Sequence, residues 1–191
     1  MLTISCHPLG DNDTFVLIEC PGTIAKKALS YAIEYSHKDT QYEYGGQDYL
    51  RAIKIDCSGL VVNCYMYAIV NTEYFLPFTD AAVIDFYKKW TVKTNIPRPG
   101  DLIFMGDNEN MPTHISICVK INDNNIYFID STFKPEEGID GVSERFYRKD
   151  DPRFLSFGVL LLGIKYSSSS LNLSLPVRIR HTRGQDFYMR G

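Results

Sequence analysis

The stretch Asp56-Cys57-Ser58-Gly59-Leu60 places a cysteine between two polar residues, at the start of an apolar run with helical spacing. The apolar positions recur every three or four residues, at Leu60, Val61, Cys64, Tyr65, Ala68 and Ile69. This spacing predicts a buried helix from Cys57 to about Val70, with Cys57 in its first turn. First-turn N–H groups lack intrahelical partners and the helix dipole adds positive potential, so both favour the thiolate. Cys57 is therefore a candidate nucleophile, and the alternative is a small apolar core residue, as most free cysteines are.

The composition of the 191-residue chain is ordinary for a soluble globular protein, with 45 % hydrophobic and 23 % charged residues. Its length fits one domain with a tail. The formal net charge of −3 points to no polyanionic partner, so we expect no nucleic-acid ligand. No stretch approaches the roughly 20 apolar residues that a membrane-spanning helix needs, so we expect no membrane span.

The beginning of the sequence does not resemble a secretory signal. The first twenty residues lack a basic start and contain Asp11, Asp13 and Glu19. This predicts a cytoplasmic protein.

The five cysteines are scattered along the chain and form no Cys-x-x-Cys pair. They are Cys6, Cys20, Cys57, Cys64 and Cys118. An odd, scattered set argues against a disulfide framework and against a structural zinc site.

The hydrophobic periodicity predicts helices early in the chain and antiparallel strands later. The expected helices span 23–37, with Thr23 as N-cap, 57–70 and 79–90. The expected strands span 15–18, 102–105, 114–119, 126–131 and 157–166, and residues 132–155 are expected to be loop. This order predicts an α+β domain, with N-terminal helices packed on a central antiparallel sheet.

Three segments follow from this pattern. Residues 1–22 form an N-terminal extension, residues 23–166 form the domain, and residues 167–191 form a serine-rich linker with a basic C-terminal tail.

A nucleophilic cysteine needs a base within hydrogen-bond reach, and the base needs an orienting group. Among the four histidines, His114 begins a predicted buried strand after a loop, which is where a scaffold presents a site residue. Asp130 lies on the returning strand of the same hairpin and could hold the imidazole. Alternatively, His114 is a structural histidine bonded to a loop carbonyl, and Asp130 caps the turn that follows it.

Four blocks in this order resemble the NlpC/P60 cell-wall peptidases over residues 24–165. The first, Tyr42-Glu43-Tyr44-Gly45-Gly46, matches the family's Tyr-x-Trp-Gly-Gly, and the second runs from Asp56 to Val61. The third is Pro99-Gly100-Asp101-Leu102-Ile103-Phe104, and the fourth, His114-Ile115-Ser116-Ile117, matches the family's His-Val-Gly-Ile. The resemblance implies a papain-like fold.

The resemblance also implies roles for individual residues. Cys57 matches the nucleophile and His114 the general base. The family's third polar residue is usually a histidine, and Asp130 is its best match here, with Ile129 or Ser131 taking that position if the strand slips by one residue.

The substrate-binding residues that the resemblance implies are Tyr42, beside the nucleophile, and Asp56 and Ser58, which would hold the free amino end of a stem peptide. Asp56 could also be only the N-cap of the helix. Tyr44 stands where the family has tryptophan, as an aromatic wall or as a core residue.

The implied activity is hydrolysis of an amide bond in peptidoglycan stem peptides, between D-glutamate and a diamino acid, with no metal and no cofactor. The expected partner is a peptidoglycan fragment or stem peptide. Because that substrate lies outside the cytoplasm, three origins stay open: a recycling enzyme, a phage protein, or a delivered effector with a partner immunity or inhibitor protein. The other candidate functions are a papain-like acyltransferase, a lipid or amide hydrolase, and a non-catalytic binding module.

Overall fold

The computed structural model describes residues 15–46, 53–108 and 110–165. The first 14 residues of the predicted N-terminal extension and the predicted linker and tail at 167–191 lie outside these residues. The described elements in chain order are β1 (Phe15–Glu19), α1 (Gly22–Ser36), β2 (Thr40–Gln41), β3 (Ile53–Lys54), α2 (Cys57–Ala68), β4 (Tyr74–Phe75), α3 (Val83–Asp85), the π-helix η1 (Phe86–Trp90), β5 (Thr91–Thr94), β6 (Leu102–Met105), β7 (His114–Ile121), β8 (Asn125–Lys134), the 3-10 helix η2 (Pro135–Glu137), β9 (Ile139–Arg148) and β10 (Phe154–Lys165).

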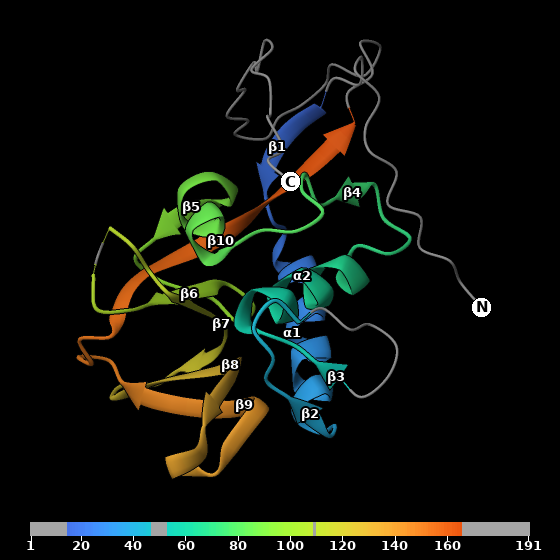
Figure 1. The fold of residues 1–191 in the computed structure, drawn as a ribbon. Helices are drawn as coiled ribbons and strands as arrows, with labels where there is room; N and C mark the ends of the chain where they lie inside the picture. The colour runs from blue at the N-terminus through green and yellow to red at the C-terminus, as the bar shows by residue number, and fades with distance from the viewer. Residues whose placement is uncertain (1–14, 47–52, 109, 166–191) are drawn as a thin grey trace.

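Within the described residues, eight strands form one antiparallel sheet (Figure 1). The main path runs β1-β10-β6-β7-β8-β9, and β4 and β5 also pair with β10. A separate parallel pair joins β2 to β3. Early helices and a mostly antiparallel sheet confirm the predicted α+β class.

Helices α1 and α2 pack against each other and against the middle strands of the sheet (Figure 1). The buried positions of α1 follow the helical period and are Ile24, Ala25, Ala28, Leu29, Ala32 and Tyr35. Helix α2 is apolar on nearly all sides because α1 covers one side and β7 and β8 cover another. The rigid surroundings of α2 fix the position of its first residue, Cys57.

The sheet buries side chains on both faces, as the alternation along β6 shows. Leu102 and Phe104 belong to the main core with the helices, whereas Ile103 and Met105 belong to a smaller cluster with Phe128 of β8. The strands next to the site are therefore held by packing from two sides.

The prediction of loop over residues 132–155 is wrong. Strand β8 continues to Lys134, and β9 pairs with it over ten residues, from Asn125↔Arg148 to Lys134↔Ile139. Strand β9 mixes β-branched and aromatic residues with four charged residues and a glycine, which weakens its strand pattern in the sequence. Pairing with β8 supplies the stabilisation that its own residues lack.

Two helix predictions also need correction. Thr23 is not the N-cap of α1, because the helix already begins at Gly22 and the carbonyl of Pro21 accepts the N–H groups of Ile24 and Ala25. The single helix predicted over 79–90 is a three-residue α3 followed by the π-helix η1. The rings of Phe86 and Trp90 both pack on Phe78, at 5.2 and 5.3 Å between centroids, and this packing holds the widened turn.

Candidate active site

The N-terminus of α2 carries Cys57 as its first residue and Asp56 as its N-cap. Asp56 is extended, with φ −93° and ψ −180°, so its side chain turns back over the first turn. Its Oδ1 accepts the N–H of Gly59 at 2.7 Å and the hydroxyl of Ser58 at 2.9 Å. The predicted capping role of Asp56 is therefore present in the structure.

His114 is the first residue of β7, and its imidazole lies between Cys57 and Asp130. Nε2 of His114 is 2.6 Å from Oδ2 of Asp130, on the neighbouring strand β8. Cys57 also acts on the charge of the imidazole, and Nδ1 is the ring nitrogen that Asp130 does not occupy. The structure thus brings together three predicted site residues that are far apart in the sequence.

The register between β7 and β8 decides which residue faces the imidazole. The pairing shifts between Cys118 and Lys120, which marks an irregularity in β7. Asp130 contacts His114, whereas the hydroxyl of Ser131 points the other way and donates to the carbonyl of Ile55 at 2.6 Å.

The electrostatics favour a charged imidazole. Burial opposes the charge, but hydrogen bonds with Asp130 and Cys57 outweigh it and raise the pKa of His114 to about 10. Burial likewise opposes ionisation of Asp130, but hydrogen bonds from His114 and Arg145 lower the pKa of this carboxyl. In this arrangement a carboxylate orients an imidazolium, and a thiol lies beside it. The thiol can act as a nucleophile, and the imidazolium can transfer a proton.

Arg145 of β9 is part of the site, although nothing in the sequence analysis selected it. Its Nε donates to Asp130 Oδ1 at 3.0 Å, and its Nη2 donates to Asp130 Oδ2. The side chains of Asp130 and Arg145 are 0 % and 8 % exposed. Recognising β9 as the partner of β8 would have found Arg145, because it stands opposite Phe128 on the strand beside Asp130.

The loop that carries Tyr42 is tied to two elements of the site. The N–H of Tyr42 donates to Asp140 Oδ1 of β9 at 2.7 Å, and the N–H of Gly45 donates to Asp56 Oδ2 at 2.9 Å. Burial and the charges of Cys57 and Asp56 raise the pKa of the Tyr42 phenol.

Tyr44 does not pack in the core, because its side chain is 91 % exposed at the tip of the same loop. The position predicted as core or wall is thus a projecting aromatic ring.

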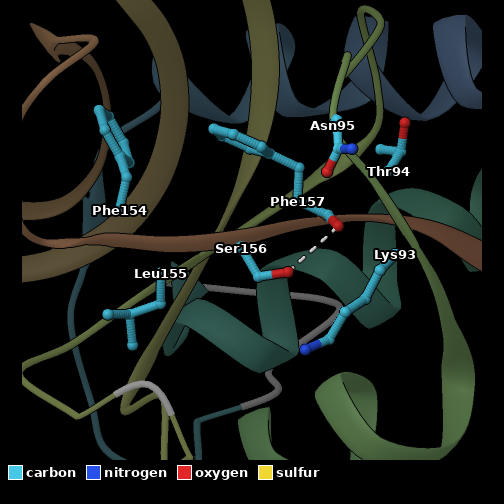
Figure 2. Close-up of a pocket in the computed structure, with 7 residues that line it drawn as sticks. All are labelled: Lys93, Thr94, Asn95, Phe154, Leu155, Ser156 and Phe157. Carbon is cyan, nitrogen blue, oxygen red and sulfur yellow. Dashed lines mark hydrogen bonds between the residues drawn. The ribbon is translucent and has the colours of Figure 1, made fainter.

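Three other features that would point to a function are a metal site, a membrane-spanning helix and a second pocket with reactive side chains. The described residues contain no group of three or more His, Cys, Asp or Glu side chains placed to hold a metal ion. None of the described helices is long and apolar enough to cross a bilayer. Figure 2 shows a shallow pocket between β5 and β10, lined by residues 93–95 and 154–157, and its lining includes no cysteine, histidine or carboxylate.

Comparisons with known proteins identify the family of the chain. The NlpC/P60 family profile matches residues 39–152, which contain all the predicted site residues. A search of curated proteins finds no match. Among solved structures, "The crystal structure of Ly7917" is similar with a TM-score of 0.48 and 9 % identity, over 71 % of this chain and 62 % of that chain. Because the family match covers more than half of the sequence, the chain belongs to the NlpC/P60 family, whose members are generally cell-wall hydrolases.

Proposed function

We propose that this protein is a papain-like cysteine peptidase that hydrolyses an amide bond in peptidoglycan stem peptides. The observation that carries the proposal is the position of His114 between Cys57 at the start of α2 and Asp130 of β8. Nucleophile, base and orienting group are the three parts that thiol-based acyl transfer needs.

The proposed reaction has two steps. The Cys57 thiolate attacks the amide carbonyl, and His114 Nδ1 gives its proton to the leaving amine as the C–N bond breaks, which leaves a thioester. A water molecule then attacks the thioester while neutral His114 takes its proton, and the C–S bond breaks to release the acid. Backbone N–H groups at the start of α2, including that of Cys57, stabilise the oxyanion in both steps.

The proposed scissile bond joins D-glutamate to a diamino acid, with Tyr42, Asp56 and Ser58 binding the free amino end of the peptide. A carboxylate offers about four lone-pair sites, and Asp56 uses three of them for Gly45, Gly59 and Ser58. No described residue occupies the fourth acceptor site, so capping the helix is compatible with binding a substrate ammonium.

The test compares stem peptides that carry a free L-alanine amine with N-acetylated copies, using mass spectrometry of the products and kcat/KM for each. We expect the free peptides to be cut about ten- to hundredfold faster, because a hydrogen bond to a charged group is worth about 1.5–3 kcal/mol. Cys57→Ala and His114→Ala should each abolish cleavage.

Asp56→Asn should remove most of the preference for the free amine. Asparagine still caps the helix but presents only one acceptor oxygen, so the loop at Gly45 is loosened as well. Loop damage slows both peptides equally, so the ratio of the two rates isolates amine recognition. Equal rates for both peptides with the unaltered enzyme would rule out the proposed amine site, and no cleavage of any stem peptide would rule out the proposed function.

A further inference from the structure

The carboxylate that orients His114 is itself held by a buried cation. Asp130 receives two N–H groups from the planar fork of Arg145, one on each carboxylate oxygen. The guanidinium also lies 5.2 Å from the ring centroid of Phe128 and 5.4 Å from that of Tyr147, and its Nη1 donates to the Tyr147 hydroxyl at 2.7 Å. These contacts hold Arg145 in a single position behind Asp130.

We infer that Arg145 is a positioning residue that holds Asp130 against His114 and partly compensates its charge, so that the imidazole keeps its proton less tightly than it would beside an unpaired carboxylate. The inference rests on the proposed function for its catalytic meaning. The effect of the Asp130 and Arg145 charges on the protonation of His114 follows from the geometry and does not depend on the proposed function.

The reason lies in the different demands of the two proposed steps. Amide cleavage needs a protonated imidazole to release the amine, whereas thioester hydrolysis needs a neutral imidazole to accept a proton from water. A buried carboxylate with no counter-charge would hold the imidazolium strongly and would slow the second step. A carboxylate paired with a guanidinium still attracts the imidazolium, but less strongly than an unpaired carboxylate would.

The charged and titratable groups around the pair are few. Asp130 and Cys57 act on His114, from β8 and α2. Arg145 faces Asp130 and Tyr147 directly, and Glu137 adds a weaker attraction. Two further cations contact Tyr147: the Nζ of Lys134 is 3.1 Å from Tyr147 Oη and 3.1 Å from Glu137 Oε1, and the guanidinium of Arg153 lies 3.6 Å from the Tyr147 ring centroid.

The test is an NMR titration of His114 in Cys57→Ala protein, where the thiol no longer contributes and no activity is needed. Arg145→Gln should raise the midpoint of the His114 titration by about one pH unit, because it removes a cation that disfavours the imidazolium and leaves Asp130 unpaired beside it. Asp130→Asn should lower the midpoint, because it leaves Arg145 as an uncompensated cation. The double variant Asp130→Asn/Arg145→Gln should give a midpoint above that of Asp130→Asn alone, because the uncompensated cation is gone, but below that of the parent, because the carboxylate is gone as well.

Two further variants separate charge from structure. Arg148→Gln removes an arginine of the same strand, whose partner Asp150 is exposed, and should leave the midpoint unchanged. Arg145→Lys keeps the charge but loses the fork, and should keep the midpoint near that of the parent. The double variant contains no unpaired buried charge, so it remains informative if Arg145→Gln fails to fold.

In the enzyme that contains Cys57, Arg145→Gln should slow thioester hydrolysis more than acylation. A burst of the first product should then appear, and the rate of the slow phase after the burst should rise at higher pH. The inference is overturned if Arg145→Gln leaves the midpoint unmoved or lowers it, or if the double variant stays as low as Asp130→Asn alone. If the variants shift the His114 midpoint as expected but the protein cuts no stem peptide, the role of Arg145 is supported and the proposed function is rejected.

Discussion

Cys57 differs from the other cysteines of the described chain in its surroundings. Burial raises the pKa of the Cys20 and Cys118 thiols to about 12, and burial also raises that of Cys64. Cys57 instead lies at a helix N-terminus beside an imidazole whose pKa is raised. Chemical reactivity at neutral pH should therefore be confined to one of these four thiols.

We predict that iodoacetamide at pH 7 modifies Cys57 at least about tenfold faster than Cys20, Cys64 or Cys118, because the alkylation rate follows the thiolate fraction and access. Peptide mass spectrometry at short times measures the four rates. The experiment uses a Cys6→Ser background, since Cys6 lies outside the described residues. His114→Ala should slow the labelling of Cys57 alone, and equal labelling of the four thiols in native protein would contradict the prediction.

Single residues show why part of the site could be predicted and part could not. Cys57 and His114 stand out because helix and strand starts can be recognised from local periodicity. The position of Asp130 depends on the β7–β8 register, which left Ile129 and Ser131 open until the structure placed Asp130 against the imidazole. Arg145 could not be predicted, because its contact with Asp130 depends on the pairing of β8 with β9, and the sequence pattern does not indicate β9.

At the scale of elements, the β8–β9 hairpin connects the two halves of the site. One part of it carries Asp130 and Arg145, and another part holds the Tyr42 loop. The close approach occurs at Gly141, where a Cβ would lie 2.4 Å from the carbonyl oxygen of Thr40, and φ is +102°. The N–H of Val142 donates to Thr40 Oγ1 at 2.8 Å and fixes this contact.

Gly141→Ala should separate β2 from β9 and displace Tyr42. We expect a loss of stability of about 2–4 kcal/mol, from the left-handed backbone and from steric overlap, together with a higher KM for stem peptides. Urea unfolding and steady-state kinetics measure the two effects.

Gly138→Ala is the matched control, because Gly138 also has a positive φ, +69°, in the same hairpin but has open space around the Cβ position. It should lose only about 1 kcal/mol and keep its KM. Similar losses for the two variants would show that the contact with Thr40 does not matter.

Element types were easier to predict than element limits. The strands at 102–105 and 114–119 and the helix at Cys57 all carry long apolar runs, and the structure contains them. The helix predicted over 79–90 failed because aromatic packing onto Phe78 overrides the local helical pattern. Strand β9 failed because its partner, and not its own composition, stabilises it.

At the scale of the whole molecule, the His114 site couples stability to pH. The folded-state pKa of about 10 lies above the ordinary value of 6.5, so the folded protein holds this proton more tightly than the unfolded chain does. The stabilisation is complete below pH 6.5 and is lost as the pH rises through 10. The Asp130 carboxyl changes stability in the opposite direction, because its pKa is lowered in the folded protein. Its stabilisation is complete above the ordinary pKa of an aspartate and is lost as the pH falls through the lowered pKa.

We predict that the free energy of unfolding falls between pH 6.5 and 8.5, with a slope approaching about 1 kcal/mol per pH unit. Tyrosine and lysine groups titrate above this window, whereas cysteines of the unfolded chain begin to ionise near its upper end, so the difference between the parent and a His114 variant isolates the His114 contribution. Urea unfolding at several pH values measures the slope, and His114→Gln should flatten it. His37→Gln, at an exposed position after α1, should keep the parental slope, and a slope unchanged by His114→Gln would contradict the prediction.

The place of β10 in the sheet has a consequence for how the chain folds as it leaves the ribosome. β10 is the last described strand to be synthesised, yet it lies between β1 and β6 and also pairs with β4 and β5. Phe15 must wait for Lys165, its partner 150 positions later, while β6 to β9 can pair as soon as they emerge. A nascent chain that stops before β10 therefore exposes unpaired strand edges that can join other chains. Insertion of β10 is the step that closes the sheet and ends this exposure.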